Sequence, residues 1–107
     1  MTAWIKTEQQ KQGFRQFVAG TTGDKNNWWR GWDFYLDDQN RINLRLINMA
    51  PGNMIHVQSD VTIPLEQWKH VAFRYDGSGK ARGTQLFVDG NEVKTNIPVS
   101  YTHLTLP

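Results

Sequence analysis

The 107-residue chain has no cysteine, no long apolar run and no large excess of either charge. The absence of cysteine excludes a disulfide framework, a thiolate zinc site, an iron–sulfur cluster and a thiol nucleophile. Because no apolar run exceeds a few residues, the sequence predicts no membrane-spanning helix. Lysine and arginine total 12 against 10 acidic residues, and this net charge of +2 is too small and too scattered to indicate nucleic-acid binding.

Apolar and polar residues alternate along almost the whole chain with a period of two, which is typical of half-buried β-strands. Turn-forming residues separate these segments, and the length fits one domain. The sequence therefore predicts an all-β fold, an antiparallel β-sandwich or barrel. The expected strands are Thr2–Lys6, Phe14–Ala19, Gly31–Asp37, Arg41–Ile47, Met54–Ser59, Trp68–Tyr75, Thr84–Asp89 and Glu92–Thr95.

The alternation fixes the register of one expected hairpin. A two-residue loop would mix its apolar and polar faces, whereas a three-residue loop, Asp38–Asn40, keeps the apolar side chains together. This register also sets Asp37 beside Arg41 and Asp33 beside Arg45, on the face that we expect to meet solvent. The expected apolar pairs are Leu36 with Ile42, Phe34 with Leu44 and Trp32 with Leu46.

A second hairpin is expected between Trp68–Tyr75 and Thr84–Asp89, joined by a long, polar and mobile connection at Asp76–Gly83. Its apolar face combines Val71, Phe73 and Tyr75 with Leu86 and Val88. The dipeptide Asp89-Gly90 then predicts a tight turn with positive backbone angles.

Two neighbouring motifs carry a family resemblance. The first is a Trp-x-His-Val-Ala segment that begins at Trp68 and ends in Tyr75-Asp76-Gly77, and the second is Leu86-Phe87-Val88-Asp89-Gly90. Together they resemble the laminin-G-like, concanavalin A-like jelly-roll superfamily. The resemblance covers roughly residues 2–99 and implies a jelly-roll β-sandwich, with Trp4 and Trp68 at core positions. A closer likeness, to the laminin-G-like segment of large planctomycete-type surface proteins with cytochrome-c-like domains, rests on Gly31–Asp38, Pro51–Asn53, Ile63–Leu65 and Tyr75–Lys80.

Two departures from the family pattern lead us to expect an incomplete fragment. Strands that close the sandwich usually follow, and another strand usually precedes the first, so we expect a partial laminin-G-like domain over residues 1–100 with uncovered sheet edges. The segment Tyr101–Pro107 is similar to the peptide that results when a sequencing-library adaptor is translated at the end of a truncated read. We therefore expect 101–107 to be a non-native tail.

Some members of the superfamily are glucanases, which carry acidic residues at alternate positions of one strand. The nearest match is Asp33 and Asp37, whose spacing along a strand is about 13 Å. Retaining glycosidases need about 5–5.5 Å between carboxyl groups and inverting ones about 6.5–9.5 Å. Pairing with arginine explains these aspartates more simply, so we expect no catalytic residues and keep a glycoside hydrolase fragment as the less favoured alternative.

The histidines and loop oxygens give no metal assignment. His56 and His70 lack a partner at a catalytic spacing, so we expect both to be structural residues on outward faces. Several relatives bind calcium through loop oxygens, and two loop sets offer such atoms. Because Asp and Asn are also ordinary turn residues, we expect no cofactor, with calcium as the alternative. The two sets are Asp24, Asn26 and Asn27, and Asp37, Asp38 and Asn40.

The run Trp28-Trp29-Arg30-Gly31-Trp32 is the candidate binding site. Sugar rings stack on exposed indoles, and a neighbouring arginine can bond their hydroxyls, so we assign ligand binding to Trp28, Trp29 and Arg30 and the core to Trp32. The alternative is that Trp28 and Trp29 seal the edge of the sandwich.

These observations and the resemblance together predict a non-catalytic, lectin-like recognition module. The expected ligand is a glycan or a protein surface, and the expected neighbours are other domains of the same parent chain. The resemblance alone implies a larger extracytoplasmic bacterial protein that is secreted, periplasmic or on the cell surface. The alternative is a structural spacer domain without a ligand of its own.

Overall fold

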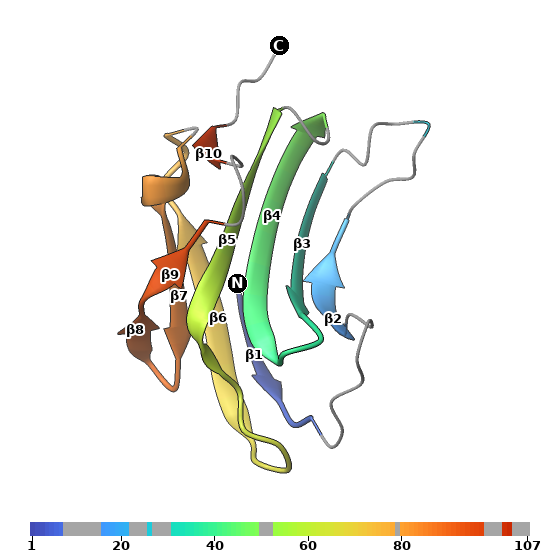
Figure 1. The fold of residues 1–107 in the computed structure, drawn as a ribbon, viewed down its shortest axis with the longest axis vertical. Coiled ribbons are helices and arrows are strands. Elements are labelled where there is room, and N and C mark those ends of the chain that lie inside the picture. Colours follow the sequence, from blue (N-terminus) through green and yellow to red (C-terminus); the bar gives the residue numbers. More distant parts are fainter. Residues whose placement is uncertain are drawn as a thin grey trace.

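Two antiparallel β-sheets pack face to face in the computed structural model, as Figure 1 shows, and the predicted all-β sandwich is confirmed. The structure describes residues 1–7, 16–21, 26, 31–49, 53–78, 80–97 and 102–103. Within these ranges no α-helix occurs, and a short 3₁₀ turn, Ala81–Gly83, precedes one of the strands. No helix in this part of the chain is long and apolar enough to cross a membrane.

The two sheets differ in size and in how their strands are connected. The four-stranded sheet has the order β1-β6-β7-β8, and the six-stranded sheet has the order β10-β5-β4-β3-β2 with β9 also paired to β5. The first sheet consists of β1 (Thr2–Ile5), β6 (Lys69–Tyr75), β7 (Thr84–Val88) and β8 (Asn91–Val93). The second consists of β2 (Gln16–Gly20), β3 (Gly31–Leu36), β4 (Arg41–Met49), β5 (Asn53–Thr62), β9 (Thr95–Asn96) and β10 (Thr102–His103).

The core lies between the sheets and is built by the alternation that the sequence displays. Each strand turns every second side chain inward, and the inward set is almost entirely apolar. Burying a large apolar side chain contributes about 1.5–3 kcal/mol, so this layer supplies most of the stabilising energy of the fold. The buried cluster consists of Phe34, Leu36, Ile42, Leu44, Ile55, Val57, Ile63, Val71 and Leu86.

The expected register of the β3–β4 hairpin and the expected apolar face of the β6–β7 hairpin are confirmed. In the β3–β4 hairpin Leu36 is paired with Ile42, Phe34 with Leu44 and Trp32 with Leu46. The three-residue loop ends in Asn40, whose φ of 61° lets the chain turn back into β4. In the β6–β7 hairpin the register is Val71 with Val88 and Phe73 with Leu86, as the apolar pattern requires.

Two strands differ most from their expected bounds. The expected strand Met54–Ser59 continues to Thr62, because a bulge interrupts its alternation opposite β4. Ser59 stabilises this bulge: its Oγ accepts a hydrogen bond from the backbone N–H of Ile42 and donates one to the carbonyl of Val61. The expected strand Glu92–Thr95 divides at Lys94, so that β8 pairs with one sheet and β9 with the other.

Two tryptophans that the resemblance assigns to the core lie outside it. Trp4 is 65% exposed and Trp68 is 63% exposed. The cause in β1 is the strand alternation, since Ala3 and Ile5 pack against the core cluster and Trp4 lies between them. The expectation of a core role for Trp4 and Trp68 is therefore wrong.

We expect Gly90→Ala to destabilise the domain by about 1 kcal/mol. In the β7–β8 turn Asp89 has a φ of 52° and Gly90 a φ of 83°, and an added Cβ at Gly90 would touch nothing within 4 Å. The loss would therefore come from backbone strain alone, and urea unfolding would measure it. The exposed Lys94→Ala is the control, and equal midpoints for the two variants would contradict the argument.

Candidate functional site

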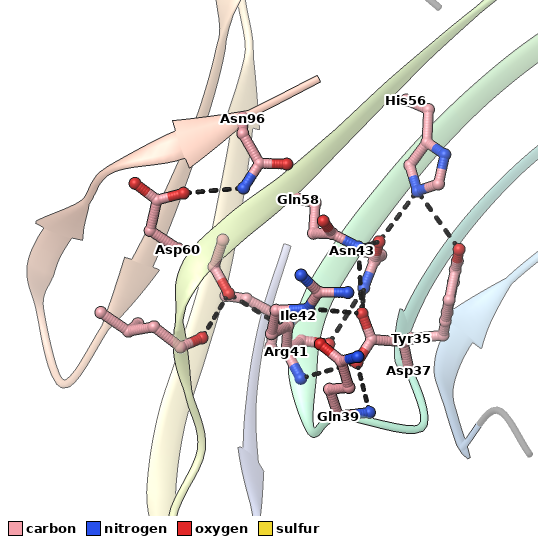
Figure 2. A network of polar contacts seen from close by, with 12 residues as sticks. Tyr35, Asp37, Gln39, Arg41, Ile42, Asn43, His56, Gln58, Asp60 and Asn96 are labelled. Atoms are coloured by element: carbon pink, nitrogen blue, oxygen red, sulfur yellow. Dashed lines mark hydrogen bonds and ion pairs between the residues drawn. The ribbon is translucent and has the colours of Figure 1, made fainter. Parts of the chain in front are cut away.

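A network of polar side chains covers the face of β3, β4 and β5 that points away from the core, as Figure 2 shows. It arises because, in two rows of residues that are paired across these strands, the polar side chains all point to the same side of the sheet. One row pairs Tyr35 with Asn43 and Asn43 with Gln58, and the next pairs Asp33 with Arg45 and Arg45 with His56. We call this surface the polar face; its residues are Asp33, Tyr35, Asp37, Arg41, Asn43, Arg45, His56 and Gln58.

Asn43 is the centre of the polar face. Its side chain is fully buried and makes four hydrogen bonds. Nδ2 donates to Asp37 Oδ2 at 3.1 Å and to the carbonyl of Arg41 at 3.0 Å. Oδ1 accepts from Gln58 Nε2 at 3.1 Å and lies 2.8 Å from His56 Nε2. Because the amide oxygen can only accept, His56 carries its proton on Nε2.

Asp37 accepts five hydrogen bonds at its two carboxylate oxygens. Oδ1 accepts from the backbone N–H groups of Gln39, at 2.9 Å, and Arg41, at 3.0 Å. Oδ2 accepts from Arg41 Nε, Asn43 Nδ2 and Gln58 Nε2, all at 3.0–3.1 Å. Burial raises the pKa of Asp37, but these hydrogen bonds and the charge of Arg41 outweigh it, so the pKa lies below its ordinary value of 3.8.

The second acidic residue of the polar face, Asp33, is 1% exposed and forms a two-pronged ion pair with Arg45. Arg45 Nε donates to Asp33 Oδ1 at 2.8 Å and Nη2 donates to Oδ2. The guanidinium also lies over the ring of Tyr35, 5.0 Å from its centroid. Burial lowers the pKa of Arg45, but Asp33 and Tyr35 outweigh it, and the net direction is upward.

The expected pairing of these charges is confirmed, but the expected solvent exposure is wrong. Asp33 does lie beside Arg45 and Asp37 beside Arg41. Asp33, Tyr35 and Asn43 nevertheless have at most 2% of their surface exposed. The neighbouring long side chains cover them, as the guanidinium of Arg45 does over Tyr35. The partly exposed residues of the polar face are Asp37, Arg41, Arg45, His56 and Gln58.

The two carboxylates of the polar face have different partners. Asp33 and Asp37 lie four residues apart in the sequence, and each is paired with a different arginine. A general acid needs a raised pKa, whereas that of Asp37 is lowered.

The histidines lie on different sheets. His56 belongs to the polar face, 3.2 Å from the hydroxyl of Tyr35, whereas His70 contacts Trp4 on the four-stranded sheet. His103 lies in β10. Among the described residues no three histidine or acidic side chains gather into a group that could hold a metal ion.

The loop between β3 and β4 was one of the two candidate calcium sets. The oxygens of Asp37 are occupied by five donors, and Asn40 Nδ2 donates to the carbonyl of Ile63. Asn40 Oδ1 is buried without a hydrogen-bond partner. Of the other set, Asn26 is exposed, while Asp24 and Asn27 lie outside the described residues.

Trp28, Trp29 and Arg30, the residues assigned to ligand binding, also lie outside the described residues. They directly precede Gly31, the first residue of β3, which is paired with Ile47. The sequence analysis missed Asn43 and Gln58 as site residues. The alternation of side chains along the strands could have revealed them, because it puts both on the same face as Asp33 and Asp37.

Two open clefts of about 320 Å³ each lie near the edges of the sandwich. The one beside β1 and β2 has an apolar floor of Ala3, Ile5, Val18 and Leu36. The other, beside β8 and β9, is more polar and includes Arg82, Gln85, Glu92 and Asn96.

The lowered pKa of Asp37 gives a pH prediction. A carboxyl group whose pKa is lower in the folded state stabilises that state above its ordinary pKa, and this contribution is lost as the pH falls below 3.8 toward the folded value. We expect the free energy of unfolding of the wild type to fall more steeply between pH 5 and about pH 2 than that of Asp37→Asn. Urea unfolding across this range measures both slopes, and parallel curves would refute the assignment.

Comparison with known proteins gives one match. The model of a laminin-G-like family, described as the concanavalin A-like lectin/glucanases superfamily, matches residues 1–105. Neither the curated proteins nor the solved structures contain a match to this chain.

Proposed function

The chain belongs to the concanavalin A-like lectin/glucanases superfamily, and we propose that it is a non-catalytic, lectin-like recognition module. Laminin-G-like domains are generally non-catalytic, although the superfamily also includes glycosidases. The proposed ligand is a glycan, with a protein surface as the alternative.

The polar face is the observation that carries this proposal. Its reachable groups are a guanidinium, an imidazole and an amide, which are planar donors and acceptors suited to sugar hydroxyls. These groups are held in place by one another and by Asn43, whose side chain makes four hydrogen bonds. Little side-chain conformational entropy is therefore lost when a ligand binds. Both carboxylates of the face are neutralised by arginine, which favours binding over hydrolysis.

Trp28, Trp29 and Arg30 complete the proposed site. They adjoin the first residue of β3 in the sequence, and Asp33 with its partner Arg45 lies at this end of the strand. Laminin-G-like domains are commonly extracellular, and we place the module in a larger extracytoplasmic bacterial protein.

A glycan array with the full chain tests the proposal. We expect specific binding to at least one glycan, weakened tenfold or more in Trp28→Ala, Trp29→Ala and Arg45→Lys, because the first two remove stacking surface and the third removes the guanidinium fork. The exposed Val61→Ala is the matched control. Wild-type protein that melts cooperatively and binds no glycan on the array would refute glycan recognition.

One observation favours the alternative of a structural spacer. The deepest members of the polar face, Asp33, Tyr35 and Asn43, are almost inaccessible and serve to tie β3, β4 and β5 together. A spacer needs this rigidity but no reachable aromatic side chains. If Trp28→Phe and Trp29→Phe each lower the fluorescence that a collisional quencher cannot reach, while the quenchable emission stays the same, both indoles are buried, as a spacer requires.

A further inference from the structure

The outer face of the four-stranded sheet carries two large exposed indoles that the polar face does not use. Trp4 and Trp68 are the most exposed large apolar side chains among the described residues, at 65% and 63%. Exposed indoles forfeit the energy that burial would provide, and a soluble domain retains such surface chiefly where it binds something.

The sheet register brings the two indoles to the same area. Trp4 on β1 is paired with His70 on β6, and their rings meet edge to face with centroids 5.2 Å apart. Val71 is fully buried, so the strand alternation turns His70 outward, and Trp68 directly precedes β6 with 63% of its surface exposed. Continuing the β1–β6 register by one residue would make Trp68 the diagonal neighbour of Trp4, a spacing of about 7–8 Å in a sheet.

The charged groups near the indoles are of both signs, because the exposed Lys6 lies two residues after Trp4 and the exposed Glu66 lies two residues before Trp68. Lys69 Nζ lies 3.0 Å from Asp89 Oδ2, and the other oxygen of Asp89 accepts the backbone N–H of His70 at 3.0 Å. Farther along the face, Gln85 bridges Arg74 and Glu92. A surface on which positive and negative groups are mixed suits a neutral ligand better than an anionic lipid or a nucleic acid.

The shape of this surface also favours one class of occupant. Tryptophans that anchor a protein partner insert into desolvated pockets within an interface of about 800 Å² per side. Here the indoles stand on the open face of a twisted sheet, surrounded by polar side chains. Such a surface suits a ligand that alternates flat C–H patches with hydroxyl groups.

We propose that Trp4 and Trp68 form an aromatic platform that binds a neutral, β-linked polysaccharide on the outer face of the four-stranded sheet. This inference rests on the proposed lectin-like function and gives it a substrate class and a second surface. In β-linked chains of glucose or N-acetylglucosamine the ring substituents are equatorial, so each ring presents an apolar C–H face that stacks on an indole. The edge-to-face contact with His70 gives the Trp4 ring a neighbour on its own face of the sheet.

Depletion assays with suspensions of microcrystalline cellulose and of chitin test the proposal on the full chain. We expect the wild type to be depleted from solution by at least one of them, and Trp4→Ala and Trp68→Ala each to lower the association constant tenfold or more. Trp4→Phe keeps a stacking ring and is expected to lose less than Trp4→Ala. Val61→Ala, an exposed apolar residue of the other sheet, is the matched control.

A double variant, Trp28→Ala with Trp29→Ala, separates this platform from the site of the proposed function. Retained depletion by the double variant, together with loss in the Trp4 and Trp68 variants, supports the platform. Loss in the double variant alone overturns the platform and leaves the lectin-like function standing. Wild-type protein that binds neither suspension overturns the platform, while the glycan array decides the lectin-like function separately.

Discussion

Replacing Arg45 with methionine is expected to destabilise the domain by about 3–5 kcal/mol, a large part of the stability of a single domain. The variant keeps the volume of the stem but removes the charge that compensates Asp33, which is 1% exposed. It also removes the guanidinium that covers the ring of Tyr35. Urea unfolding at neutral pH, followed by tryptophan fluorescence and circular dichroism, measures the loss.

Arg41→Met is the matched control for Arg45→Met, because the same substitution there breaks the other ion pair of the polar face. The side chains of Arg41 and Asp37 are 27% and 12% exposed, and Asp37 keeps its remaining donors. We therefore expect a loss of about 1 kcal/mol at this position. Equal losses in the two variants would mean that burial does not increase the contribution of the Asp33–Arg45 pair to the free energy of unfolding.

Asn43→Leu is expected to cost about 3 kcal/mol, although it introduces an apolar residue of similar size at a fully buried position. The amide makes four hydrogen bonds, and its removal takes an acceptor from both His56 and Gln58 and a donor from Asp37. Chemical unfolding measures the loss. A variant as stable as the wild type would show that water or rearranged neighbours replace every one of these bonds.

Asn43→Asp is expected to destabilise the domain to an extent that depends on pH. The new carboxyl would lie where Nδ2 is now 3.1 Å from Asp37 Oδ2, so two like charges would meet and the pKa of one would rise. A carboxyl group whose pKa is raised in the folded state destabilises that state above its folded pKa, and this penalty disappears as the pH falls. We therefore expect the deficit of Asn43→Asp relative to the wild type to shrink between pH 7 and pH 4.

The sequence predicted the hairpins well because local alternation and turn chemistry determine them. Pairing of Leu36 with Ile42 follows from the parity of two short segments and from one loop, and no distant residue takes part. The positive φ of Asp89 and Gly90 follows in the same way from a two-residue turn signal. These features needed no knowledge of the tertiary fold.

Other features depended on contacts that no local pattern contains. The continuation of β5 to Thr62 relies on a bulge that Ser59 stabilises against β4, and Ile63 is held by a hydrogen bond from its N–H to the carbonyl of Asn40 at 2.7 Å. The burial of Asp33 and Tyr35 depends on how Arg45 folds over them. The core assignment of Trp4 was wrong for a different reason. It followed the position of this residue in the family, whereas Ala3 and Ile5 both point inward and therefore require Trp4 to point outward.

The pairing of β1 with β6 has a consequence for how the protein is made. The terminal ammonium of Met1 donates to the carbonyl of Phe73, a residue 72 positions later, and β1 is hydrogen-bonded to β6 over its whole length. At a synthesis rate of about 5–20 residues per second, the first strand leaves the ribosome roughly 4–14 s before that partner exists. Throughout this interval its backbone and the indole of Trp4 are open to other chains, so the nascent polypeptide is most vulnerable to aggregation before residue 75 emerges.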